Sequence, residues 1–180
     1  MKRRSIVHYV LELIVIVGFL ILGVTVLTYL FQKIPFDKII IGAIVLTIGV
    51  LELTDFITWK YATRVRSIQS LIAALAGIAL GIVILVVKNM DENTMCIIWG
   101  AFSIAFSVAK IATGTINLVY QPLLNIVKII LAITEIVFSI LLIVEKAGAI
   151  HAHMVFLSVA LIVEAFTLVI EFIIHRYQRL

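Results

Sequence analysis

Eight charged side chains lie inside segments that are otherwise apolar, and these are the residues of the chain with the clearest capacity for chemistry. They are Glu12, Glu52, Asp55, Lys110, Lys128, Glu135, Glu164 and Glu171. An ionised group near the centre of a bilayer costs about 2.5–3.5 kcal/mol on insertion scales, so such groups normally face the protein interior and find partners there. The pattern therefore predicts an internal polar cluster.

The cluster has two interpretations, because six carboxylates and two lysines do not balance. In the first, contacts such as Glu52–Lys110 and Lys128–Glu135 link the helices. In the second, the excess carboxyl groups hold protons or meet a cation, and serve proton or cation movement or pH sensing. Glu135 and Glu164 lie nearest the middle of their apolar segments, which favours them as the protonated groups.

The stretch "GVLELTDFITWK" carries two of these carboxylates three residues apart. Glu52 shares a helical stripe with Gly42 and Gly49, and it matches Lys110 at a spacing of 58 residues. Asp55 lies one turn closer to the polar flank of the segment. We therefore expect Glu52 to be the buried, partnered group and Asp55 the hydrated one.

The composition places these residues in a membrane. The chain has 180 residues, of which 64% are hydrophobic and only 13% are charged, whereas about 25% of residues are charged in ordinary soluble domains. A spanning helix needs about 20 apolar residues. Six segments meet this requirement, at about 6–31, 37–58, 67–88, 94–119, 122–144 and 152–174. The predicted fold is an all-α, six-span transmembrane domain over residues 1–180.

The chain also repeats itself at intervals of about 58 residues. Three sets of small residues keep this spacing without a gap: Gly42, Gly100 and Ser158; Gly23, Gly81 and Ser139; Gly18, Ala76 and Thr134. This spacing predicts three tandem helical hairpins, at about 5–62, 63–120 and 121–178, arranged around an axis along the membrane normal. Coincidence among abundant small residues is the alternative.

Small residues indicate where the helices pack, because membrane helices associate by close backbone approach. The segment "GIALG" is a G-x-x-x-G motif, and Ser70 and Ala74 extend the same helical face. The predicted packing residues are Gly42, Gly49, Gly77, Gly81 and Gly100.

Basic residues indicate the orientation. Eight flank one end of the six-span arrangement and four the other: Lys2, Arg3, Arg4, Lys60, Arg64, Arg66, Arg176 and Arg179 against Lys33, Lys38, Lys88 and Lys146. This asymmetry predicts both termini in the cytoplasm. We expect the basic flanks to meet anionic lipid headgroups, not nucleic acid. Trp59 and Trp99 fall at opposite predicted interfaces.

Other candidate sites are weaker. The single Cys96 excludes an intrachain disulfide and is expected to be a buried, inert thiol. His151 and His153 form an "HAH" pair at the start of the sixth segment, where a solvated role is favoured over a metal site or titration in an acid medium. No zinc-protease, nucleophile-elbow or phosphate-loop motif is present. We expect a non-enzymatic protein without cofactor or metal. The sequence does not decide whether the protein forms a homo-oligomer.

The pattern "GFLILGV…IPFDKIIIGAIVLTIGVLELTDFI" over residues 18–57 resembles the HdeD-like acid-resistance membrane proteins. The features that carry the resemblance are Gly18 and Gly23, the loop residue Pro35, and then Gly42 and Gly49. The resemblance implies a small multi-pass protein of a bacterial or archaeal cytoplasmic membrane, linked to acid or envelope stress. It implies no catalytic residues.

The orientation can be tested by cysteine labelling in a variant that lacks Cys96. Because the basic residues favour a cytoplasmic location for both termini, Thr63→Cys and Gln178→Cys should react only with reagent on the cytoplasmic side. Asp91→Cys should react only from the other side. Labelling of position 63 from outside would reverse the predicted orientation.

Overall fold

The computed structural model contains six α-helices, and it describes residues 6–33, 37–59, 64–88, 90–119, 122–145 and 149–177. The helices are α1 (Ile6–Phe31), α2 (Lys38–Trp59), α3 (Arg64–Val86), α4 (Glu92–Asn117), α5 (Pro122–Glu145) and α6 (Ile150–Tyr177). Each contains a segment long and apolar enough to cross a membrane. The predicted six-span, all-helical fold is therefore confirmed.

Some residues used in the sequence predictions lie outside the described part of the chain. They are the basic residues Lys2, Arg3, Arg4, Lys60, Lys146 and Arg179, and the loop residue Pro35.

The local sequence explains how several helices begin and end. Asp91 caps α4, because its carboxylate accepts a hydrogen bond from the backbone N–H of Thr94. This bond and one from the Thr94 hydroxyl hold the pKa of the exposed Asp91 carboxyl below its ordinary value. Pro122 opens α5, where its missing N–H costs nothing. Lys33 follows α1 with a φ of 54°, a left-handed conformation typical of helix ends.

Threonine hydroxyls occur on the outer faces of the helices without exposing polar groups to lipid. Thr25, Thr47 and Thr134 each donate to the backbone carbonyl four residues earlier, at 2.8, 2.7 and 2.9 Å. The hydroxyl is thus satisfied within its own helix. Large apolar side chains make up much of the remaining outer surface.

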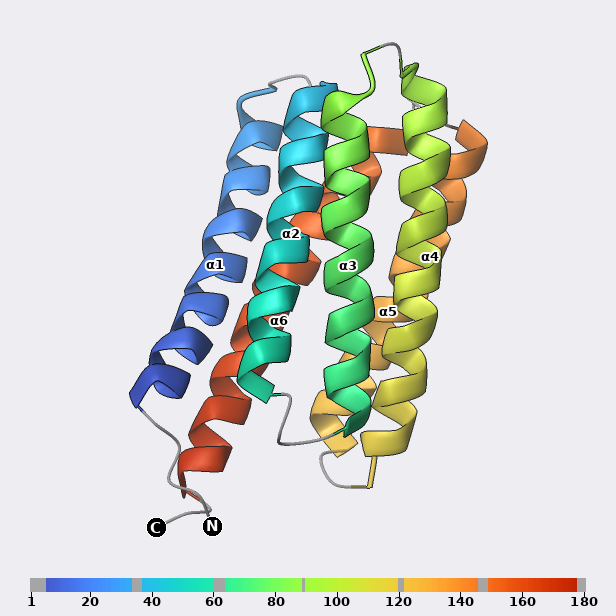
Figure 1. Ribbon diagram of the computed structural model, residues 1–180. Helices are drawn as coiled ribbons and strands as arrows, with labels where there is room; N and C mark the ends of the chain where they lie inside the picture. Colours follow the sequence, from blue (N-terminus) through green and yellow to red (C-terminus); the bar gives the residue numbers. More distant parts are fainter. Residues whose placement is uncertain are drawn as a thin grey trace.

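The six helices form one bundle in which α1 begins and α6 ends at the same end (Figure 1). The most extensive contacts join α2 to α3, α4 to α5, and α1 to α6. Each of these pairs connects two different predicted hairpins. The contacts within the hairpins, α1 with α2, α3 with α4 and α5 with α6, are smaller. The repeats thus dock on one another in a closed cycle.

Repeat-related small residues make these interfaces. A Cβ on Gly100 of α4 would lie 2.9 Å from the Ser139 carbonyl oxygen of α5, and a Cβ on Gly23 of α1 would lie 3.0 Å from the Ser158 carbonyl oxygen of α6. At the α2–α3 interface, Gly42 meets Leu85 and Gly81 meets Leu46. These residues include two of the three predicted sets of small residues, those of Gly42 and of Gly23, so the 58-residue repeat is also a repeat of helix packing.

The closest backbone approach joins Gly49 of α2 to Gly77 of α3. A Cβ on Gly49 would lie 2.5 Å from the backbone nitrogen of Ile78 and 2.8 Å from the carbonyl carbon of Gly77. A Cβ on Gly77 would in turn lie 3.0 Å from the Cα of Gly49. Backbone atoms cannot move aside as a side chain can, so position 49 requires glycine, and a side chain at position 77 would be tightly packed.

Gly49→Ala should destabilise the protein although alanine favours a helix by about 1 kcal/mol over glycine. The added methyl would push α2 and α3 apart, and overpacking of this kind costs roughly 1–3 kcal/mol. Gly18→Ala is the matched control, because its methyl would meet only the end of the flexible Leu51 side chain. Thermal unfolding in detergent measures both. A Gly49→Ala protein as stable as the control would contradict the packing argument.

Candidate functional site

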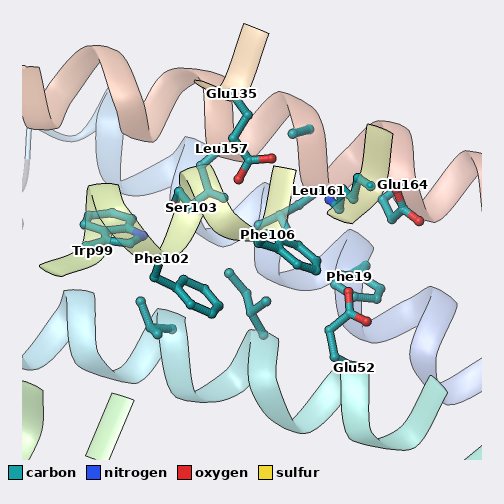
Figure 2. A pocket seen from close by; sticks show the side chains of 14 residues that line it. Phe19, Glu52, Trp99, Phe102, Ser103, Phe106, Glu135, Leu157, Leu161 and Glu164 are labelled. Atoms are coloured by element: carbon teal, nitrogen blue, oxygen red, sulfur yellow. The ribbon is translucent and has the colours of Figure 1, made fainter. Parts of the chain in front are cut away.

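A cavity lies inside the bundle, and its wall is mainly apolar with a few polar and charged side chains (Figure 2). Its volume is about 40 Å³, which is room for roughly three water molecules. It is lined by Phe19, Val45, Ile48, Glu52, Trp99, Phe102, Ser103, Phe106, Lys110, Glu135, Leu157, Ala160, Leu161 and Glu164. Most of these side chains come from α2, α4 and α6.

The lining residues follow the repeat. Val45, Ser103 and Leu161 all line the cavity and are separated by 58 residues each. Ile48, Phe106 and Glu164 form a second set of lining residues with this spacing. Phe19 and Glu135, which also line the cavity, are separated by two repeats. Equivalent positions of three repeats can meet only around their common axis. The cavity therefore lies on the pseudo-threefold axis of the bundle.

Four ionisable groups reach this cavity: Glu52 from α2, Lys110 from α4, Glu135 from α5 and Glu164 from α6. The Lys110 ammonium interacts electrostatically with all three carboxylates. Figure 2 shows Glu135 and Glu52 entering from opposite sides of the cavity, with Glu164 beside Leu161. Glu135 is buried, whereas the other three are partly buried.

The cavity lies at mid-membrane depth. The spanning segments of α5 and α6 are Pro122–Glu145 and Ile150–Ile173. At about 1.5 Å of rise per residue, Glu135 lies roughly 2 Å from the middle of its segment, and Glu164 lies roughly 4 Å from the middle of its own. Charges at this depth are the most costly to leave without compensation.

Aromatic side chains form much of the cavity wall. Phe19 comes from α1, and Trp99, Phe102 and Phe106 come from α4. The rings of Phe102 and Phe106 are stacked, with centroids 6.1 Å apart and planes 5° apart. The Lys110 Nζ lies 4.5 Å from the centroid of Phe106, within range of a cation–π interaction. The cavity thus combines negative charge with aromatic faces.

The other four predicted polar residues, Glu12, Asp55, Lys128 and Glu171, do not line the cavity. Asp55 accepts a hydrogen bond of 2.9 Å from Ser70, and Lys128 forms an ion pair of 2.8 Å with Glu171. The Glu12 side chain is also buried, at 4% exposure.

The sequence places Ser70 on the packing face of the third helix, but sequence reasoning did not connect Ser70 or Thr113 with these polar residues. Ser70 is one repeat from Glu12 and from Lys128, and Thr113 is one repeat from Asp55 and from Glu171. Ser70 bonds Asp55, and Thr113 bonds Gln69 of α3. The 58-residue spacing that relates Glu52 to Lys110 could have found Ser70 and Thr113.

Three predictions about these charged residues were wrong in whole or in part. Asp55, expected to be hydrated, is buried at 6% exposure, because it faces Ser70 across the α2–α3 interface. Glu52, expected to be buried and partnered with Lys110, is only partly buried, although it does interact electrostatically with Lys110. Lys128, proposed to contact Glu135, instead pairs with Glu171, because the two side chains bridge α5 and α6.

The expectations that both histidines are solvated and that Trp99 lies at a membrane interface were also wrong in part. His153 is buried, and its ring meets Trp99 edge to face, with centroids 4.7 Å apart. Trp99 is only 2% exposed, so it packs inside the bundle and not at a membrane interface. His151 is exposed, and Cys96 is buried as expected.

Comparison of the chain with protein-family models, curated proteins and solved structures finds no match. Within the described ranges, no three histidine, cysteine or acidic side chains are grouped so that they could hold a metal ion.

Ser70→Ala should destabilise the protein, because it removes a hydrogen-bond donor from the buried Asp55 carboxyl. Loss of a partner by a buried polar group costs about 1–3 kcal/mol. Ser139→Ala is the control, since that hydroxyl donates to the Glu135 carbonyl of its own helix at 2.7 Å. Thermal unfolding in detergent compares them. Equal stability of the two variants would show that the Asp55–Ser70 contact contributes little.

Proposed function

We propose that this multi-pass membrane protein exchanges protons or a small cation with its axial cavity, as part of proton- or cation-coupled transport. The observation that carries the proposal is the charge imbalance of the cavity. Among the described residues that line it, the carboxylates of Glu52, Glu135 and Glu164 share the space with one ammonium, that of Lys110.

The imbalance needs compensation. If every group were ionised, the cavity would carry a net charge of −2, from three negative charges and one positive charge. With room for roughly three waters, hydration cannot stabilise that charge as bulk water would. Ionised groups in a poorly hydrated site instead take up protons or attract counter-ions. Those protons or ions are the exchangeable species of the proposal.

A purely structural role explains the other polar residues better than it explains the cavity. Lys128 with Glu171 and Asp55 with Ser70 form direct contacts at 2.8 and 2.9 Å, each joining two helices. In the cavity, by contrast, one lysine serves three carboxylates that come from three different helices. Direct helix linkage gives each acid its own partner, whereas Glu135 and Glu164 share Lys110.

The resemblance to HdeD-like proteins supports a narrower proposal, a non-enzymatic role in acid or envelope stress in a bacterial or archaeal cytoplasmic membrane. The carboxylates of the cavity would give such a role a physical basis, because a carboxyl group can take up and release a proton. The charge asymmetry of the sequence supports cytoplasmic termini and contact with anionic lipid headgroups in this proposal.

Glu135→Gln should abolish proton movement through the purified protein in liposomes after a pH jump. Glutamine cannot take up and release the proton, and a positioned proton-transfer group contributes about a hundredfold or more to a rate. Glu145→Gln is the matched control, since Glu145 is an exposed residue at the end of the same helix. Flux that survives Glu135→Gln, or is absent from the wild-type protein, would count against proton coupling through this cavity.

A further inference from the structure

We propose that the axial cavity binds a small protonated amine, ammonium or methylammonium, and that the Lys110 side chain is a tethered competitor for the same place. The inference rests on the proposed function, since both use this cavity. It adds the chemical class of the cation that the cavity accepts.

The cavity already holds one primary ammonium, that of Lys110. Its Nζ lies 4.5 Å from the centroid of Phe106 and interacts with the carboxylates of Glu135, Glu164 and Glu52. A primary ammonium carries three N–H donors, which suits several acceptors approaching from different sides. A free ammonium ion or methylammonium presents the same head group without the tether.

The aromatic wall favours an amine over a small metal cation. Small, hard cations bind to shells of oxygen atoms, whereas the aromatic side chains Phe19, Trp99, Phe102 and Phe106 offer ring faces or edges in place of oxygens. Ammonium groups are attracted to the faces of aromatic rings and form hydrogen bonds to carboxylates at the same time. The cavity supplies both kinds of partner.

The size of the cavity restricts the ligand. A volume of about 40 Å³ accommodates a few water-sized groups. Ammonium is close to water in size and methylammonium is one methyl group larger. A quaternary ammonium with long alkyl arms would not fit, so the proposal is confined to the smallest amines.

The charge balance explains how a second cation can be accepted. Among the described lining residues, Glu135 and Glu164 share the one ammonium of Lys110, so one negative charge of this pair remains to be compensated. A bound amine would offset that charge, and protonation of Glu52, Glu135 or Glu164 would compete with its binding. Removal of the Lys110 ammonium should therefore strengthen the binding of a free amine.

Binding of radiolabelled methylammonium to the purified full chain in detergent tests this inference. We expect Lys110→Met to bind methylammonium at least about tenfold more tightly than the wild type, or roughly 1.4 kcal/mol. Lys128→Met is the matched control, because that lysine pairs with Glu171 away from the cavity lining. It should leave the affinity unchanged. Unlabelled ammonium should displace the label, and sodium at the same concentration should not.

A second variant guards against poor folding of Lys110→Met, whose cavity would carry three carboxylates and no lysine. Lys110→Met combined with Glu52→Gln keeps the net charge of the wild-type cavity and should also bind methylammonium more tightly than the wild type. The inference is overturned if these variants bind no better than Lys128→Met, or if sodium displaces methylammonium as well as ammonium does. Because binding is measured without a gradient, its result is independent of the proton-flux assay.

Discussion

Close approach of helix backbones is the constraint on which the rest of this structure depends. Lipid offers apolar side chains the same environment as the protein interior, so the helices must gain their association from tight packing. Gly49 against Gly77, Gly100 against Ser139 and Gly23 against Ser158 provide it. These contacts join successive repeats and close them into a cycle, and the inward faces of α2, α4 and α6 then surround an axis where polar side chains are sheltered from lipid.

The polar side chains then separate into two groups with different chemistry. Asp55 with Ser70 and Lys128 with Glu171 connect neighbouring helices through direct bonds. The carboxylates and the lysine of the axial cavity share a small volume with aromatic rings, and their charges do not balance. The first group stabilises the assembled bundle. The second group forms the site to which we assign the proposed proton or cation exchange.

The sequence predicts the helices and their repetition well, because hydropathy and spacing depend only on local order along the chain. The small-residue sets anchored on Gly42 and Gly23 even identify the interfaces. The partners of individual polar residues were less predictable. Asp55 and Glu52 lie on neighbouring faces of α2, and only the position of α3 makes Asp55 the more buried of the two. Trp99 and His153 lie near helix ends in the sequence, yet the bundle covers both of them.

The small residues of the repeat recur where helices touch, whereas the side chains at equivalent positions around the cavity differ in chemistry. Ile48, Phe106 and Glu164 occupy one set of equivalent positions, and Val45, Ser103 and Leu161 occupy another. A trimer of identical hairpins could not contain such a site, because every axial charge would face two copies of itself. Joining the three hairpins in one chain removes that restriction, since each copy can carry a different side chain. Covalent linkage of the repeats thus allows an acid, a base and a ring to share one symmetry axis.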